Sequence, residues 1–134
     1  MVPHMSQSPS YPLSRAAQLL GVSSDTARRW ADAGRFPTGV DASGRRVVAG
    51  ADLAAFAAGL VDEPEPGRTS ARNAFPGIVT RVLADTVVAQ VDVQAGPHRV
   101  VSLMTREAVD ELGLVPGVEV LALVKAPHVI VELP

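Results

Sequence analysis

The sequence predicts an α+β protein made of two small domains, the first mainly helical and the second mainly β-strand. Apolar residues recur at helical spacing through residues 11–60, whereas short apolar runs separated by turn residues fill residues 68–134. Residues 61–67 between them contain two prolines, three acidic residues and a glycine, a composition typical of a linker. Apolar residues make up 47% of the 134 residues, which is enough for a core.

The first domain is expected to open with two helices joined by a tight turn at residues 21–23. Ser14 is the expected N-cap of the first helix, and Ser23 or Ser24 that of the second. Gly34 ends the second helix, and Pro37 prevents its continuation.

A β-hairpin and a third helix are expected to complete this domain. Residues 40–48 predict the hairpin, with its turn near Ser43-Gly44, and residues 51–60 predict an alanine-rich helix. Six arginines against four aspartates between residues 13 and 60 give this part of the chain a net charge of +2.

Four arginines of this domain fall in the second predicted helix and the predicted hairpin, where a winged helix-turn-helix contacts DNA. Two helices followed by a basic hairpin have the geometry of a winged helix-turn-helix, whose second helix enters the major groove. That helix would bring Ser24, Arg28 and Arg29 to phosphates or base edges. Arg45 and Arg46 on the hairpin would hold the flanking DNA backbone.

The motifs of this domain resemble the MerR-like and excisionase-like DNA-binding domains. The resemblance covers roughly residues 11–60 and is carried by residues 13–30, Ala33-Gly34-Arg35-Phe36-Pro37, Gly44-Arg45-Arg46 and Asp52-Leu53. It implies binding to double-stranded DNA. The competing interpretation is that the arginines are ordinary solvated surface; Trp30 is expected in the core rather than stacked on a base. A single small module buries little surface on DNA, so specific binding is expected to need a homo-oligomer.

The second domain is expected to be a small OB-like β-barrel of five strands with one short helix. The strands are predicted at residues 77–83, 87–93, 99–104, 118–125 and 128–133. Thr105 is expected to cap the helix, whose apolar positions Ala108, Val109 and Leu112 fall at helical spacing, and Gly113 to stop it.

Two segments far apart in this domain each place one cation at the edge of an apolar strand. Arg72 lies in Ser70-Ala71-Arg72-Asn73, and Lys125 lies in residues 124–127. Thr105, at a helix N-terminus, adds N–H groups that favour an anion. Two cations beside hydroxyls and backbone donors suit a tetrahedral dianion. Monohydrogen phosphate would leave its own proton unpaired among donors, at a cost of about 1–3 kcal/mol.

These motifs resemble a molbindin domain, the Mop or TOBE type, over essentially all of residues 68–133. The family is an OB-like barrel that binds molybdate or tungstate between subunits. By position, the resemblance implies that the ligand groups are Ser70, the Ala71 backbone N–H, Arg72, Thr105 and Lys125. One departure is Ala108, where the family often has a serine. The motifs that carry the resemblance are residues 70–77, Ala89-Gln90-Val91-Asp92-Val93, residues 104–108, residues 112–117 and residues 124–127.

Several other functions are disfavoured by composition. The chain has no cysteine, so thiolate metal sites and cysteine nucleophiles are excluded. His4, His98 and His128 lie at no metal-ligand spacing and are expected on the surface, and Asp92 is expected to be a surface or turn residue. No Ser/His/Asp set or paired carboxylate suggests an enzyme or a catalytic residue, and no cofactor is expected beyond the oxyanion ligand. No apolar run approaches the roughly 18 residues of a membrane span, so a cytoplasmic protein is expected.

Together these features predict a molybdate- or tungstate-responsive transcriptional regulator that binds operator DNA. The alternative is an oligomeric oxyanion storage or homeostasis protein without a role at DNA. One barrel per chain fits the higher oligomers of the family that it resembles, which implies a homo-oligomer that is dimer-based or a hexamer built as a trimer of dimers. A phage-type excisionase would explain the first domain and leave the second without a purpose. Regulation predicts a salt-dependent affinity for DNA, whereas storage predicts a high anion stoichiometry and no binding to DNA.

Overall fold

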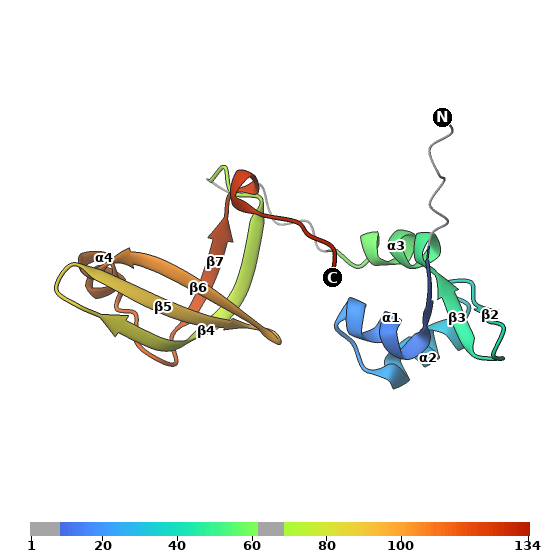
Figure 1. Ribbon diagram of the computed structural model, residues 1–134. Coiled ribbons are helices and arrows are strands. Elements are labelled where there is room, and N and C mark those ends of the chain that lie inside the picture. The colour runs from blue at the N-terminus through green and yellow to red at the C-terminus, as the bar shows by residue number, and fades with distance from the viewer. Residues whose placement is uncertain (1–8, 62–68) are drawn as a thin grey trace, which may run out of the picture. The chain divides into compact units, whose positions relative to one another are not determined.

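The computed structural model describes residues 9–61 and 69–134, which fall into two compact units that divide between residues 63 and 64 (Figure 1). The predicted linker, residues 61–67, lies outside the described residues except for Val61, and His4 lies outside them as well. Each unit has its own buried core. The two are therefore described separately.

The first unit combines three helices with a small antiparallel sheet. Central strand β3 pairs with β1 on one side and β2 on the other. Phe36, Val48 and Leu53 anchor the core, with Trp30 and Phe56 packed against it in partly buried positions. The elements in chain order are β1 (Ser10–Pro12), α1 (Leu13–Leu20), α2 (Ser24–Asp32), β2 (Gly39–Val40), β3 (Arg46–Ala49) and α3 (Gly50–Ala58).

Of the two helix N-caps predicted in this unit, one is confirmed and one is wrong. Ser23 caps α2, and its side chain accepts a hydrogen bond from the Thr26 N–H at 3.1 Å. Ser14 does not cap α1, because the helix begins at Leu13 and its N-cap is Pro12, which makes no side-chain cap bond. Strand β1 leads directly into α1, so no residue is left between them to act as a polar cap.

The hairpin predicted at residues 40–48 is present as β2 and β3. Val40 lies opposite Arg46 in the antiparallel register. The Asp41 carboxylate accepts hydrogen bonds from the backbone N–H groups of Ser43 and Arg45, both at 2.9 Å. Gly44, at φ +81°, takes the left-handed conformation that the turn requires.

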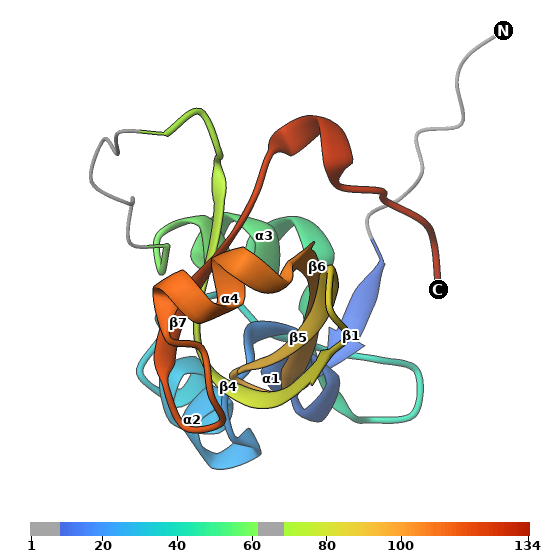
Figure 2. The same ribbon diagram turned by 90° about the vertical axis from the view of Figure 1, so that its left-hand side faces the viewer.

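The second unit is a curled, four-stranded antiparallel sheet with a helix at one end (Figure 2). The strand order is β6-β5-β4-β7, so the long strand β4 pairs with β7 through its first half and with β5 through its second. Val79, Val91, Val93 and Val109 form the centre of the core. The elements are β4 (Asn73–Ala84), β5 (Val88–Ala95), β6 (His98–Thr105), α4 (Arg106–Leu112), β7 (Glu119–Val124) and the 3₁₀ turn η1 (Ala126–His128).

Strand β4 begins at Asn73, earlier than the sequence predicts, and includes Pro76. Because β5 pairs with β4 only from Ile78 onward, Pro76 has a neighbouring strand on one side only. Proline is tolerated in a strand where no ladder bond from its nitrogen is needed. The early start matters because it extends the sheet to the edge of the Ser70–Arg72 segment.

The predicted fifth strand and closed barrel are corrected by the structure. Residues 129–134 carry no strand, and the sheet stays open between its edge strands β6 and β7. Pro127 lies in the 3₁₀ turn that leads the chain away from β7. The apolar residues beyond it therefore have no partner strand among the described residues: Ile130, Val131 and Leu133 are 91%, 88% and 91% exposed.

Candidate oxyanion and DNA-binding sites

Pairing of β4 with β7 brings the two cationic segments of the second unit together. Asn73 lies opposite Val124, and its side-chain amide donates a hydrogen bond to the Val124 carbonyl oxygen at 3.0 Å. Arg72 immediately precedes β4 and Lys125 immediately follows β7, so both residues lie just beyond this pair. Two cations 53 positions apart in sequence therefore flank the same end of one strand pair.

The loop that carries Arg72 is shaped by Thr69, which the sequence analysis did not single out. The Ala71 N–H donates to the Thr69 hydroxyl oxygen at 3.1 Å. Arg72 Nη1 donates to the carbonyl oxygens of Thr69 and Ala71 at 3.2 and 3.4 Å. A hydroxyl residue two positions before an N–H is the local signal for such a turn. An oxyanion bound to the Ala71 N–H would have to replace the Thr69 hydroxyl there.

The remaining side chains at this end of the sheet are open to solvent. Ser70, Arg72 and Lys125 are all exposed, and Ala71 is half-buried. Lys125 precedes η1, and its carbonyl accepts a hydrogen bond from the His128 N–H at 2.9 Å. Both the cations and the hydroxyl are thus available to a ligand from solution.

Thr105 lies at the opposite end of the same sheet. It ends β6, pairs with Val88, and caps α4 by accepting a hydrogen bond from the Ala108 N–H at 3.1 Å. The 12-residue strand β4 separates this end from Arg72, a contour length of roughly 35 Å (Figure 1). The structure brings together four of the five predicted oxyanion residues, and one chain cannot place all five around one small anion.

On the first unit, the predicted residues of α2 are all exposed. Ser24 is the first residue of the helix. Arg28 makes a loose ion pair with Asp25 at 3.8 Å and stays 65% exposed. Arg29 donates to the Thr26 hydroxyl at 3.2 Å. Both arginines keep donors that face solvent.

The two hairpin arginines differ in what they contact. Arg45 Nε donates to Asp41 at 3.1 Å, and the side chain is 66% exposed. Arg46 Nε donates to the Thr38 hydroxyl at 3.1 Å and its Nη1 donates to Asp32, with the side chain 39% exposed. The sequence assigns both arginines the same role, but in the structure Arg45 bonds within the turn whereas Arg46 bonds to residues outside it.

Another arginine of the first unit, Arg35, packs on aromatic rings. Its guanidinium carbon lies 5.4 Å from the Trp30 ring centroid and 5.2 Å from that of Phe56. Such cation–π contacts stabilise a packed arrangement of the three side chains. Trp30 thus packs in the domain, as predicted, but Phe56 is brought to it from α3, a contact that no local sequence signal announces.

Asp92 is buried, and the prediction of a surface or turn residue is wrong. It lies in β5 at 5% exposure. Gln90 Nε2 donates to Oδ1 at 3.0 Å, and Arg99 Nε and Nη2 donate to Oδ2 at 3.1 and 2.9 Å. Hydrogen bonds from Gln90 and then Arg99 lower the pKa of the Asp92 carboxyl below its ordinary value. The carboxylate therefore links β5 to β6 through its hydrogen bonds with Arg99.

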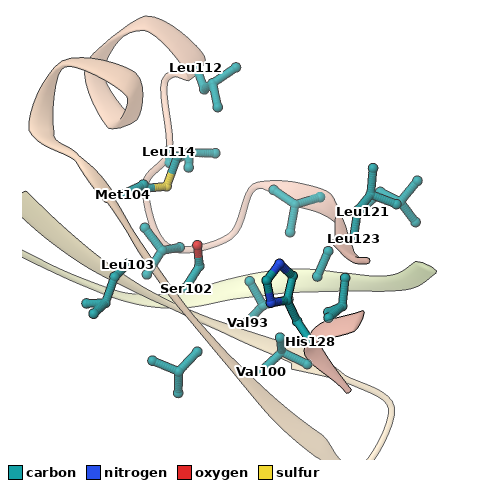
Figure 3. Close-up of a pocket in the computed structure, with 15 residues that line it drawn as sticks. Val93, Val100, Ser102, Leu103, Met104, Leu112, Leu114, Leu121, Leu123 and His128 are labelled. Carbon is teal, nitrogen blue, oxygen red and sulfur yellow. The ribbon is translucent and has the colours of Figure 1, made fainter. Parts of the chain in front are cut away.

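The open side of the second unit is an apolar hollow between β6 and β7. Val93, Val100 and Met104 are among its lining side chains. Figure 3 shows Ser102 and His128 among the apolar groups around it. His128 is exposed, as is His98, which agrees with the prediction for both.

Residues 9–61 and 69–134 contain no group of three or more histidine, cysteine or acidic residues that could hold a metal ion. Over the same ranges, no helix is both long enough and apolar enough to span a bilayer.

Comparison with known families assigns both units. The helix-turn-helix domain family matches residues 13–60, and the TOBE domain family matches residues 69–131. The chain carries a helix-turn-helix domain followed by a TOBE domain. The first match identifies a helix-turn-helix without dividing it into MerR-like or excisionase-like types.

Three similar proteins each match about half of this chain. The molybdenum-pterin-binding protein MopA of Rhodobacter capsulatus is 43% identical over 63 residues, covering 46% of this chain and 24% of MopA. MopB of the same organism is 45% identical over 64 residues, covering 47% and 24%. A solved molybdate-binding protein from Sporomusa ovata is 33% identical, with 49% of this chain and 98% of that chain covered and a TM-score of 0.47. The chain spans about a quarter of the length of the curated relatives it matches.

Proposed function

We propose that this protein is a transcriptional regulator that responds to molybdate or tungstate. Its TOBE domain binds the oxyanion and its helix-turn-helix domain binds operator DNA. The observation that carries the proposal is the β4–β7 pairing, which sets Arg72 beside Lys125 at an exposed end of a TOBE domain. The 43% identity over 63 residues to a protein named a molybdenum-pterin-binding protein supports this choice of anion.

The chemistry of the Arg72 end suits a fully deprotonated tetrahedral anion. Arg72 and Lys125 supply positive charge, and the Ser70 hydroxyl and the Ala71 N–H, once the anion replaces the Thr69 hydroxyl there, supply neutral donors. Charge-assisted hydrogen bonds are stronger than neutral ones, so a dianion benefits most from such a set. A protonated anion would gain less, because its own O–H needs an acceptor.

The position of Thr105 favours a site shared between subunits. Because Thr105 caps α4 at the far end of the sheet, it reaches an anion held by Arg72 only if it comes from a second copy. An anion contacting both copies would stabilise one assembly over others. A ligand shifts an equilibrium by its difference in affinity for the two states, so the anion would change how pairs of helix-turn-helix domains meet DNA.

The open sheet supports assembly of at least two copies. Apolar residues of the tail, residues 129–133, are exposed, while the edge strands β6 and β7 border an apolar hollow. Exposed apolar surface and unpaired strand edges are both unfavourable in an isolated soluble domain. The tail of one copy would cover the hollow of another, giving a dimer or a hexamer built from dimers.

One experiment tests the proposal as a whole. Operator-like duplexes selected from a randomised pool are titrated with the full chain, with and without molybdate, while calorimetry measures binding of molybdate, tungstate, sulfate and phosphate. We expect tight molybdate or tungstate binding that changes the affinity for DNA. Arg72→Ala and Lys125→Ala should each abolish anion binding with the fold retained, whereas Arg15→Ala, a charge-matched control in the other unit, should not. Absence of DNA binding in both states would contradict the regulator.

A second candidate is oxyanion storage, and one observation favours it. Arg28, Arg45 and Arg46 each contact an aspartate within the first unit, which reduces the positive charge that unit offers to DNA. Storage predicts several anions per oligomer and no binding to duplex DNA at any salt concentration. The titrations above separate the two functions directly.

A further inference from the structure

Arg46 joins three segments of the first unit that carry the proposed DNA contacts. It is the first residue of β3, and its guanidinium reaches Asp32, the last residue of α2, and Thr38, just before β2. Its Nε–Thr38 Oγ1 distance is 3.1 Å. The hairpin is thereby connected to the end of the second helix by a side chain, in addition to the connecting backbone.

Arg46 also compensates an acid in an unfavourable place. Asp32 lies in the last turn of α2, where the helix dipole is negative and a carboxylate is disfavoured. A carboxylate on a helix that approaches DNA would also repel phosphates. The Arg46 guanidinium, hydrogen-bonded to Asp32 Oδ1, offsets both effects.

The neighbouring Arg45 has a different environment. It projects from the turn at 66% exposure, and within residues 9–61 its side chain pairs with Asp41, which also holds the turn through two backbone N–H groups. Arg45 can therefore reach a phosphate without releasing a contact between elements. Arg46 could do so only by leaving Asp32 or Thr38.

We propose that Arg46 is a positioning residue that fixes the hairpin relative to α2, and that Arg45 is the hairpin arginine that contacts DNA. This inference rests on the proposed DNA-binding function of the first unit. It assigns different roles to two adjacent arginines that the sequence treats alike.

Salt dependence separates a phosphate contact from a positioning role. The affinity of the full chain for a selected duplex is measured across salt concentrations for the wild type, Arg45→Ala, Arg46→Ala and Thr38→Val. Each phosphate contact makes the slope of log affinity against log salt concentration more negative by about 0.9. We expect Arg45→Ala to lose one such contact. Arg46→Ala and Thr38→Val should bind several-fold more weakly with the wild-type slope.

Asp32→Asn gives a second, sharper readout because the proposal predicts a reversal of sign. In the wild-type background it replaces the charged partner of Arg46 by a neutral and weaker acceptor, so affinity should fall although a negative charge is lost. In the Arg46→Ala background it removes an uncompensated carboxylate, so affinity should rise. Thermal unfolding of each variant confirms that binding is measured on folded protein, and Thr38→Val and Asp32→Asn keep the test valid if Arg46→Ala fails to fold.

The outcomes distinguish this inference from the function on which it rests. Tighter binding by Asp32→Asn in the wild-type background, together with a reduced slope for Arg46→Ala, would overturn the positioning role and make Arg46 a direct contact. A wild-type chain that binds no duplex would instead overturn DNA binding itself, and the positioning role with it.

Discussion

Arg99 donates two hydrogen bonds to a single carboxylate oxygen of Asp92 across the β5–β6 pair, from Nε at 3.1 Å and from Nη2 at 2.9 Å. The two residues are diagonal neighbours, since Asp92 lies directly opposite Val101. Gln90 occupies the other oxygen. The carboxylate is therefore held on both oxygens by side chains of one sheet face.

This arrangement predicts how stability depends on pH. A carboxyl whose pKa is lowered by folding stabilises the native state above its unfolded pKa, and that stabilisation is lost as the pH falls through the folded pKa. The pKa of Asp92 is lowered, so the second unit should lose stability in acid below the ordinary aspartate pKa. Asp92→Asn should lower the melting temperature at neutral pH and flatten its acid dependence.

Melting temperatures of the wild type and Asp92→Asn between neutral and acid pH provide the measurement. Asp41 and Asp85 also have lowered pKa values, chiefly from backbone hydrogen bonds, so some acid sensitivity should persist in the variant. Glu111→Gln, at an exposed position of α4, serves as the matched control. Equal acid dependence of the wild type and Asp92→Asn would contradict the prediction.

Gly77 is expected to be intolerant of a side chain because β4 and β5 approach closely there. A Cβ at this position would lie 2.5 Å from the Gln94 carbonyl oxygen and 2.7 Å from Val93 Cγ1. Since backbone cannot yield as a flexible side chain does, Gly77→Ala should destabilise the second unit by about 1–3 kcal/mol. Chemical denaturation would measure this. Gly39→Ala, in β2 of the first unit, has no atom within 4 Å of the added carbon and should have little effect on the stability of that unit.

The parts of the structure predictable from sequence are those set by local patterns. Ser23 and Thr105 are each predicted as helix N-caps, and in the structure both cap a helix. Ser43-Gly44 marks the hairpin turn, which the structure contains. In each case the determining interactions span only a few residues, so the sequence displays them directly.

The features that sequence reasoning missed depend on contacts between distant residues. Asp92 looks like a surface residue because its partner Arg99 follows in the next strand and compensates its burial only once the sheet has formed. Residues 129–133 are rich in β-branched residues, as strands are, but they pair with neither free edge of the described sheet. The sequence analysis placed Arg72 and Lys125 in one site through a family resemblance, but the β4–β7 register that sets them at the same end of the sheet is specified by no local pattern.

If the oxyanion site is shared between subunits, two inactive variants should restore it when mixed. Arg72→Ala lacks a group at one end of the sheet and Thr105→Ala lacks one at the other. A mixed dimer would contain one site with neither change and one with both. Subunits exchanged by mild unfolding and refolding should therefore recover molybdate binding in calorimetry, up to half the sites in each mixed dimer. No recovery after verified exchange would contradict the shared site and remove Thr105 from the ligand groups.

The exposed tail gives a prediction that depends on alternation along a strand. If residues 129–133 pair with another copy, neighbouring side chains must point to opposite faces, so Val131 would face the hollow and Glu132 would face away. Val131 is 88% exposed within one chain, and Val131→Asp should therefore be harmless to a monomer. In an assembly it would bury a charge in an apolar site and should dissociate the oligomer. Sedimentation velocity of Val131→Asp and of the control Glu132→Gln measures this; an unchanged oligomer in Val131→Asp would show that the tail does not enter the hollow.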